Sequence, residues 1–330
     1  MPRTLICNLD HEERLAGLPA RARPEIERKL AASFLFLGEA DDVLVAEREL
    51  PEAFRARFPG LPRIVSRALP AGSATLEWAP TEPARVIRRV SSKAFALELA
   101  RTLGLEVAGV ACRSRREVEE HLPEGRWVMK RAFGHGGLGH FLGAGRALPP
   151  NAPGWIEKAL ASGEPVVLEP WVEREADFSV QLEVGEKVEV LAVLELLVTA
   201  QGAYRGNRIG TVPAAVADEL ARVAREVGEA LRVEGYRGPA GVDAYRSGGK
   251  LRPLVEVNPR FTMGRIALAV ARRLGEEVGS WLTFTGKLAE GPHHVVTDPF
   301  PDEPGPSSVF VRARSREELL DREREITGMA

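Results

Sequence analysis

The sequence predicts an α/β protein of two or three domains, on the basis of three features. Short apolar segments alternate with helical ones near the amino terminus, an order typical of parallel strands joined by helices. Two long apolar segments at 177–185 and 187–199 predict neighbouring strands. The segment 214–231 then places apolar residues along one stripe of a helix. A chain of 330 residues is long enough for more than one hydrophobic core.

The first domain is predicted over residues 1–90 as a small sheet of parallel strands. Residues 68–83 are rich in Pro, Gly, Ser and Thr, which predicts a connection to the next domain. Within the first domain we expect strands at 4–9, 34–37 and 42–45, and helices at 24–32 and 51–58.

Two further domains are expected, a small lobe with a lid over 91–170 and a large lobe with a metal site over 171–330. Ser114 and Glu117 form a capping box that begins one helix of the small lobe. A charged helix that begins after Ser315 should be a solvated carboxyl-terminal element. The remaining elements are expected as helices at 91–103, 153–161 and 263–274, and strands at 126–131 and 165–169.

The composition is that of an ordinary soluble enzyme. The formal net charge of −2 gives no electrostatic reason to expect nucleic acid or a membrane as a partner. Cys7 and Cys112 are the two cysteines, which fits a reducing compartment without a disulfide framework. The apolar run 190–199 contains Glu195 and is too short to cross a bilayer, and no signal peptide is visible. We therefore expect a cytoplasmic protein.

The segment 242–258 carries the most informative spacing, because it predicts a β-hairpin with paired carboxylates. Apolar and polar residues alternate on both sides of a glycine-containing turn at 247–249. Roughly symmetric pairing about that turn brings Asp243 near Glu256 across the ladder, and Asn258 shares a face with Glu256. Carboxylate and amide oxygens are ligands that Mg²⁺ prefers when it also holds phosphate. The alternative is a merely solvated hairpin face.

A lysine and a glycine-rich loop lie upstream. The apolar strand 126–131 delivers Lys130, and the glycines let backbone N–H groups approach an anion. The pattern is not a Rossmann loop, since two prolines at 149–150 prevent a long helix after it. No Gly-Lys-Ser/Thr motif or kinase triad is present. The segment therefore predicts a flap over a nucleotide or, alternatively, an ordinary surface turn. Its glycines are Gly134, Gly136, Gly137 and Gly139.

The segment Glu169-Pro170-Trp171-Val172 predicts a bend after a buried strand. Pro170 cannot donate to a sheet, so the backbone groups beside it are free to contact the edge of a purine. The ring of Trp171 is more simply explained as a core aromatic.

Taken in order, these motifs resemble the ATP-grasp superfamily, which includes biotin carboxylase and D-alanine–D-alanine ligase. The resemblance covers residues 85 to 275, departs from the family at Pro170, where a lysine is often found, and includes Lys93 at the start of a helix. It implies an amino-terminal α/β domain followed by a two-lobed ATP-grasp module with a mobile lid. It implies Mg²⁺, or Mn²⁺, held by Asp243, Glu256 and Asn258. The ATP-binding residues it implies are Lys93, Lys130, Gly134, Gly136, Gly137, Glu169, Trp171, Val172 and Asp177.

The resemblance also implies an activity, that of an ATP-dependent ligase. ATP would convert a carboxylate into an acyl phosphate, an amine would displace phosphate, and Arg260 together with Lys130 would stabilise the transferring group. Other ATP-grasp chemistry (phosphotransfer or carboxylation) and a non-catalytic nucleotide-binding module are the alternatives. The implied partners are ATP and small-molecule or peptide carboxylate and amine substrates, and a homodimer is left open.

The segment 201–210 is dense in glycine and arginine and predicts a loop. Arg205 and Arg208 in this loop would bind a substrate carboxylate, or else belong to an exposed basic surface. His135 and His140 lie in the glycine-rich flap and are assigned no role.

Overall fold

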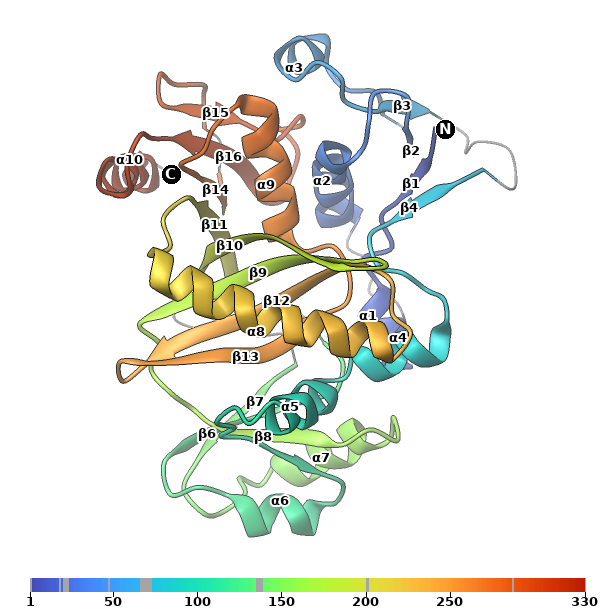
Figure 1. Ribbon diagram of the computed structural model, residues 1–330, viewed down its shortest axis with the longest axis vertical. Coiled ribbons are helices and arrows are strands. Elements are labelled where there is room, and N and C mark those ends of the chain that lie inside the picture. Colours follow the sequence, from blue (N-terminus) through green and yellow to red (C-terminus); the bar gives the residue numbers. More distant parts are fainter. Residues whose placement is uncertain are drawn as a thin grey trace.

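The computed structural model describes residues 2–17, 19, 24–46, 48–65, 73–134, 139–199, 202–286 and 288–329. Within these ranges the chain forms three β-sheets, stacked along the long axis of the molecule (Figure 1). The large sheet runs from the middle to the upper left, where β14, β15 and β16 lie, the amino-terminal sheet lies at the upper right, and the third sheet forms a lid at the bottom. Across the described ranges, every helix is too short or too polar to cross a membrane.

The amino-terminal sheet has the order β3-β2-β1-β4 and all its pairings are parallel, as predicted. Two details of the prediction are wrong. Residues 34–37 do not form a strand, because Phe34, Leu35 and Phe36 are all buried and continue a helix as a 3₁₀ turn, η1 (Leu35–Leu37). Within the predicted connection 68–83, Thr75–Glu77 forms strand β4, because it pairs with the open edge of β1. The other elements are β1 (Thr4–Ile6), α1 (His11–Leu15), α2 (Pro24–Phe34), β2 (Val43–Val45), α3 (Glu52–Arg57) and β3 (Arg63–Val65).

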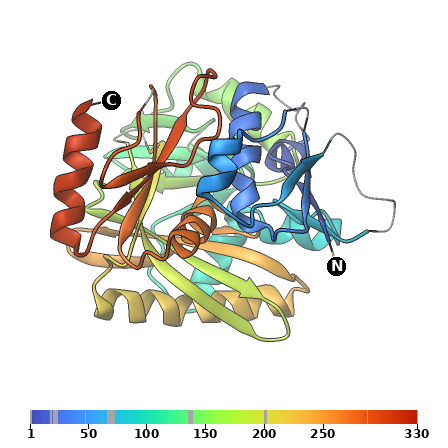
Figure 2. The same ribbon diagram turned by 90° about the horizontal axis from the view of Figure 1, so that it is seen from above.

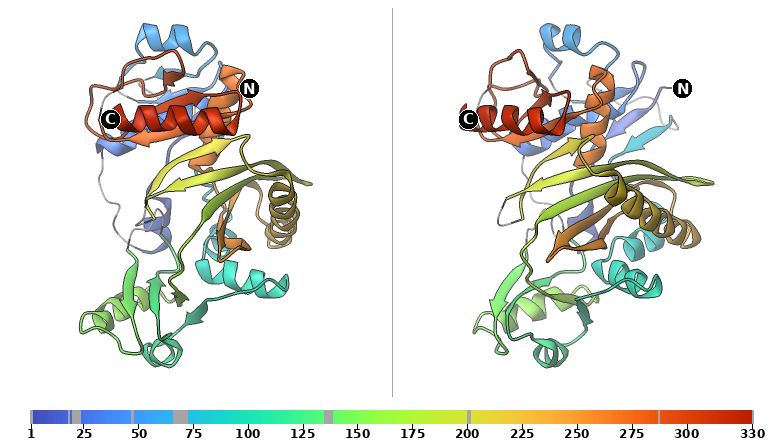
Figure 3. Two further views of the ribbon diagram at one scale, coloured as in Figure 1. Left: turned by 90° about the vertical axis from the view of Figure 1, so that its left-hand side faces the viewer. Right: turned by 60° about the vertical axis from the view of Figure 1, so that its left-hand side comes forward.

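The lid is an antiparallel sheet of order β5-β8-β6-β7 with two helices of its own. In Figure 3 it lies at one end of the molecule, below the large sheet. The predicted capping box is confirmed, because the Ser114 hydroxyl accepts a hydrogen bond from the Glu117 amide at 3.2 Å. The bounds are β5 (Val110–Cys112), α6 (Arg115–His121), β6 (Arg126–Lys130), β7 (Phe141–Ala144), α7 (Ala152–Leu160) and β8 (Val166–Pro170). Helices α4 (Ala84–Val90) and α5 (Lys93–Thr102) lead into it.

The large sheet has the order β13-β12-β9-β10-β11-β14-β16-β15, with antiparallel pairing throughout. The amphipathic helix predicted at 214–231 is α8 (Ala214–Val233), and its apolar stripe packs on β9 and β10. Helix α9 (Met263–Leu274) has the predicted bounds and packs on β11. The strands are β9 (Ala176–Val184), β10 (Val188–Val198), β11 (Tyr204–Ile209), β12 (Gly238–Ser247), β13 (Lys250–Asn258), β14 (Gly279–Phe284), β15 (His294–Val296) and β16 (Ser307–Arg312).

Two expectations for this part of the chain are corrected. Arg205 and Arg208 do not lie in a loop, since β11 pairs with both β10 and β14. Helix α10 (Arg316–Met329) is not simply solvated, because Leu319 and Ile326 are buried against the end of the large sheet. Figure 2 shows α10 and the amino-terminal strands on opposite sides of the molecule.

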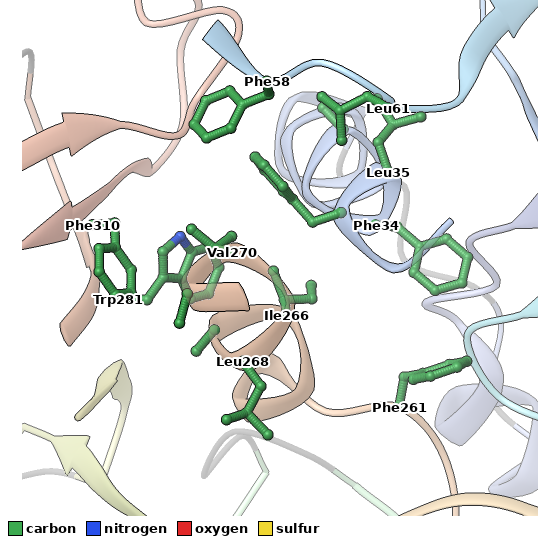
Figure 4. Close-up of a cluster of buried hydrophobic side chains, with 14 of the residues drawn as sticks. Phe34, Leu35, Phe58, Leu61, Phe261, Ile266, Leu268, Val270, Trp281 and Phe310 are labelled. Atoms are coloured by element: carbon green, nitrogen blue, oxygen red, sulfur yellow. The ribbon is translucent and has the colours of Figure 1, made fainter. Parts of the chain in front are cut away.

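One apolar core joins the two ends of the chain. Phe34 packs edge-on against Trp78 and Phe261, with ring centroids 5.8 and 5.7 Å apart (Figure 4). The same cluster includes residues of α9 and β14. A buried ion pair of 2.9 Å between Lys29 and Asp298 also joins α2 to the carboxyl-terminal segment. The lid has a separate core, so the cavity described next lies between the lid and a continuous body.

Candidate functional site

A cavity of about 1510 Å³ lies between the lid, the β12–β13 hairpin and the amino-terminal segment. Its volume exceeds the roughly 300–1,000 Å³ that is common for the site of one small ligand. Residues of the lid sheet, the large sheet and α1 line it, together with Trp78 just after β4. By its volume the space is large enough for two ligands side by side. The lining includes Glu12, Lys130, His140, Glu169, Asp177, Asp243, Glu256, Asn258 and Arg260.

The hairpin has the predicted register, with Asp243 directly opposite Glu256. The Asp243 carboxylate accepts hydrogen bonds of 2.9 Å from the Ser179 hydroxyl and from the Asn258 side-chain amide. Burial and the nearby charge of Glu256 raise the pKa of Asp243 to about 6. The charge of Glu256 thus opposes ionisation of Asp243, and a cation bound between them would favour the ionised form.

Lys93 comes from the small lobe and reaches this hairpin. It is the first residue of α5, where the Ser92 hydroxyl caps the helix and the Lys93 amide donates to Ala132 O at 3.0 Å. Its ammonium donates to Glu256 and to the carbonyl of Gly134 at 2.8 Å. Burial would lower the pKa of Lys93, but the carboxylate of Glu256 outweighs it and raises the pKa. The lysine therefore stays charged inside the protein.

Lys130 is the last residue of β6 and faces the cavity from the lid. Its ammonium pairs with Glu169 on the neighbouring strand β8 at 2.5 Å. Gly134 follows in the flap with a φ of 147°, a conformation that residues with a side chain rarely adopt. Gly136 and Gly137, also predicted to bind ATP, lie outside the described residues.

The segment after Glu169 lines the cavity as well. The Trp171 amide donates to Arg126 O at 2.8 Å, and the Arg126 guanidinium lies 5.2 Å from the Trp171 ring centre. Val172 is half-buried beside it. Asp177, in β9, is buried and pairs with Arg174 at 2.6 Å. All four of Glu169, Trp171, Val172 and Asp177 are thus at the cavity wall.

Arg260 follows the hairpin and lies between it and the amino-terminal segment. Its Nη2 donates to Asn258 Oδ1 at 3.0 Å, and its Nη1 donates to Phe261 O at 3.2 Å. Glu12 of α1 accepts from Nε and from Nη2 at 3.0 and 2.7 Å. Burial by itself would lower the pKa of Arg260, but the charge of Glu12 outweighs this effect and raises the pKa above its ordinary value.

The two arginines predicted to bind substrate differ in position. Arg205 is exposed and is not among the residues that line the cavity. Arg208 does line it, but its guanidinium pairs with Glu195 at 2.9 Å and with Glu323 of α10 at 2.6 Å. Through these two ion pairs Arg208 of β11 connects β10 to α10, so its guanidinium stabilises the packing of these elements.

Comparison with known proteins decides the family. The ATP-grasp domain family matches residues 97–264, just over half of the chain. The chain belongs to the ATP-grasp family. No curated protein matches the sequence.

Solved structures of ATP-grasp proteins share this fold. The biotin carboxylase domain of 2-oxoglutarate carboxylase from Hydrogenobacter thermophilus, in complex with MgADP, ADP and bicarbonate, is 13% identical, with a TM-score of 0.63 over 98% of this chain and 89% of that one. N5-carboxyaminoimidazole ribonucleotide synthetase from Thermus thermophilus is 14% identical, with a TM-score of 0.58 over 97% and 96%. N5-carboxyaminoimidazole synthase from Aspergillus clavatus, in complex with ADP and 5-aminoimidazole ribonucleotide, is 13% identical, with a TM-score of 0.59 over 99% and 98%. The predicted ATP-grasp fold is confirmed.

The hairpin of this ATP-grasp chain fits a divalent cation. Asp243 and Glu256 place two hard carboxylate groups opposite each other, which is the kind of ligand that such a cation prefers. Across the described residues no group of three His, Cys, Asp or Glu side chains is arranged as a metal site. The third ligand would therefore be Asn258, whose Oδ1 now accepts from Arg260.

Sequence reasoning missed the contribution of the amino-terminal segment. His11, Glu12 and Glu13 line the cavity, although α1 is a short helix with no recognisable motif. The available signal was their position after the first predicted strand, because ligands bind at the carboxyl ends of parallel strands. His140, which was assigned no role, also lines the cavity.

Proposed function

We propose that this ATP-grasp chain is an ATP-dependent ligase that activates a carboxylate as an acyl phosphate for attack by an amine. The observation that carries the proposal is the convergence of buried Lys130 and a carboxylate pair on one large cavity, with buried Lys93 paired to Glu256 of that pair. Buried cations beside oxygen ligands are suited to a polyphosphate and its metal ion. The volume left beside a nucleotide would hold the acid and the amine.

Each residue has a role in this proposal. Lys93 and Lys130 neutralise the phosphates of ATP, and the backbone around Trp171 and Val172 contacts the adenine. Asp177 accepts from the ribose hydroxyls, and Gly134, Gly136 and Gly137 bring the flap to the phosphates. Asp243, Glu256 and Asn258 would hold Mg²⁺, or Mn²⁺, which supplies charge neutralisation at the phosphate oxygens. Arg260 stabilises the phosphoryl group as it moves to the substrate carboxylate.

The reaction then needs positioning more than acid–base chemistry by the protein. A substrate carboxylate oxygen attacks the terminal phosphorus, and ADP leaves with the electron pair of the broken P–O bond. The amine attacks the acyl carbon, the C–N bond forms, and phosphate leaves and takes up a proton from the nitrogen. Holding both substrates in one closed cavity is itself a large rate factor.

A carboxylation is the second candidate, because two of the similar structures contain bicarbonate or an aminoimidazole nucleotide. In that case bicarbonate would be the acid that ATP activates. Phosphotransfer differs from both, since it leaves the phosphate on the product. A cytoplasmic location fits each of these reactions.

A screen of ADP release against pooled carboxylates, pooled amines and bicarbonate tests the proposal. A ligase releases ADP and phosphate in equal amounts when both an acid and an amine are present. Release with bicarbonate and an amine alone would identify a carboxylation, and ADP without phosphate would identify phosphotransfer. In the Glu256→Gln variant, which keeps the size of the side chain, we expect turnover to fall by about two orders of magnitude or more, because charge neutralisation at the phosphoryl group is lost.

A further inference from the structure

Hydrogen bonds hold the amino-terminal segment at the point where it reaches the cavity, just after β1. The side chain of Asn8, just after β1, donates to Ala79 O at 2.8 Å and accepts from the Ala79 amide at 3.0 Å. These bonds hold the end of β1 beside the end of β4. Helix α1 begins three residues later with His11, which is buried. The position of Glu12 therefore depends on the amino-terminal sheet, to which Asn8 connects the start of α1.

Glu12 and Arg260 form a closed ion pair at the cavity wall. Their side chains are 12% and 14% exposed, and the shortest distance between Arg260 Nη2 and Glu12 Oε1 is 2.7 Å. An arginine side chain has five N–H donors. Glu12 accepts from two of them, Asn258 from a third and the carbonyl of Phe261 from a fourth. Among the residues that the structure describes, the second Nη1 hydrogen has no acceptor and could meet a ligand oxygen, and these four bonds fix the plane of the guanidinium.

Other ion pairs between the amino-terminal and carboxyl-terminal parts of the chain do not have this position. Arg57 and Glu290 also bridge these parts, but neither residue lines the cavity. Glu12 differs because both Glu12 and its partner Arg260 line the cavity beside the β12–β13 hairpin. If Glu12 only held the two domains together, its partner would not need to be an arginine at the cavity wall.

We propose that Glu12 is a positioning residue that fixes the guanidinium of Arg260 for the transferring phosphoryl group. The amino-terminal domain thereby completes the catalytic centre of the ATP-grasp module. This inference rests on the proposed function, in which Arg260 contacts the terminal phosphate. Glu12 acts through Arg260 and not on the substrate itself.

A double-mutant cycle tests this role in the full chain. Glu12→Gln keeps the shape of the side chain but weakens its hold on Arg260, so we expect kcat to fall by about tenfold to a hundredfold, as small misplacements in active sites do. Affinity for ADP, measured by calorimetry, should change less than about twofold, because ADP lacks the terminal phosphate. In the Arg260→Lys background the same change should have no further effect on kcat. Glu12→Asp, which keeps the charge, should recover part of the rate.

Glu290→Gln is the matched control, since it removes one carboxylate from a bridging pair away from the cavity. It should leave kcat unchanged. The inference is overturned if Glu12→Gln keeps the wild-type kcat, or if its effect adds fully to that of Arg260→Lys.

A readout without turnover separates this inference from the proposed function. The preference for β,γ-imido ATP over ADP should fall in Glu12→Gln and in Arg260→Lys, but not in Glu290→Gln. If the wild type turns over no acid and amine pair, the ligase proposal fails while this ratio still tests Glu12. An unchanged ratio in Glu12→Gln would refute the positioning role.

Discussion

At the scale of single residues, each of three buried cationic side chains at or beside the cavity forms an ion pair with a carboxylate. Lys93 pairs with Glu256, Lys130 with Glu169 and Arg260 with Glu12. Buried charges are stable only when they are paired, so these contacts hold the cations in the ligand-free protein. Phosphate groups must then compete with carboxylates for the same ammonium and guanidinium donors. A metal ion at Glu256 would free Lys93 for that contact.

The first prediction concerns Lys130. We expect Lys130→Met to weaken ATP binding by about tenfold or more, because a charge-assisted contact to phosphate contributes roughly 1.5–3 kcal/mol. Calorimetric titration with ATP and Mg²⁺ measures it. Lys158→Met, at an exposed lysine of α7 in the same lid, is the control and should bind like the wild type. Equal affinities for all three proteins would place Lys130 outside the nucleotide site.

The second prediction concerns His140 and pH. Burial, together with the charges of Lys130 and Lys93, lowers the pKa of His140 to about 4. The unfolded chain protonates this histidine near pH 6.5, while the folded protein does so near pH 4. Stability should therefore be lost as the pH falls from about 6.5 to about 4, by no more than about 3 kcal/mol.

Urea unfolding of the wild type and of His140→Asn over this pH range tests the effect of His140. The difference in unfolding free energy between the two proteins should change with pH in the stated direction. Parallel pH profiles would show that His140 titrates normally.

At the scale of elements, the lid owes its shape to one close contact. Gly143 in β7 lies over the buried ring of Trp127, and a Cβ at this position would come within 2.2 Å of that ring. A glycine is therefore required for β7 to pair with β6 above the tryptophan. The lid carries Lys130 and Glu169, so the placement of this ion pair at the cavity depends on the same packing.

The third prediction follows from that contact. Gly143→Ala should destabilise the protein by about 1–3 kcal/mol, because the buried Trp127 ring must shift. Gly154→Ala is a matched control in α7, where nothing lies within 4 Å of the added methyl group. It should be neutral or stabilising by up to about 1 kcal/mol, since alanine favours a helix. Thermal unfolding measures both, and equal midpoints for the two variants would contradict the packing argument.

The fourth prediction concerns closure of the lid. Hydrogen exchange in β7 and at Gly134 should slow when ATP and Mg²⁺ are added, because the flap is proposed to contact the phosphates. Strand β15, which is the last strand of the large sheet and does not line the cavity, is the internal reference and should not change. Unchanged exchange in β7 with saturating nucleotide would make the flap an ordinary turn.

At the scale of the whole molecule, the two ends of the chain form one body. Phe261 follows the β12–β13 hairpin and packs against Phe34 of α2 in a core that also contains Trp78. Arg260, which we propose contacts the phosphoryl group, is the neighbour of Phe261 in sequence. Packing of the amino-terminal domain therefore sets the position of Arg260 from both sides, through Glu12 and through this core.

The fifth prediction tests this shared core. Phe261→Ala should lower the unfolding free energy by about 3–5 kcal/mol, as truncation of a buried phenylalanine does. Hydrogen exchange of β1 and β14 should accelerate together, while β6 in the lid stays protected. Leu142→Ala is the control, because Leu142 is 54% exposed and should cost less than about 0.5 kcal/mol. Accelerated exchange in β1 alone would mean that the two ends unfold separately.

The features that the sequence determined by itself are local ones. Alternation on both sides of a glycine turn predicted the hairpin that carries Asp243 and Glu256, and apolar spacing predicted the bounds of α9. The direct pairing of the two carboxylates also depends on a register shift between Asp243 and Tyr245. The capping box of α6 could likewise be predicted from the four positions 114–117. In each case the interacting residues are close in the chain, so residue type and spacing alone decide the conformation.

Tertiary structure decided the features whose partners are far apart. Buried contacts on all sides made 35–37 a 3₁₀ turn, pairing with β14 made the segment around Arg208 a strand, and burial of Leu319 fixed α10. Glu12 and Arg260 are separated by 248 residues, and no local pattern encodes their pairing. The sequence motifs of this ATP-grasp chain therefore determine its local structure by themselves. The pairing of Glu12 with Arg260 depends instead on which distant segments the shared core brings together, because a buried charge is stable only beside a partner of opposite charge.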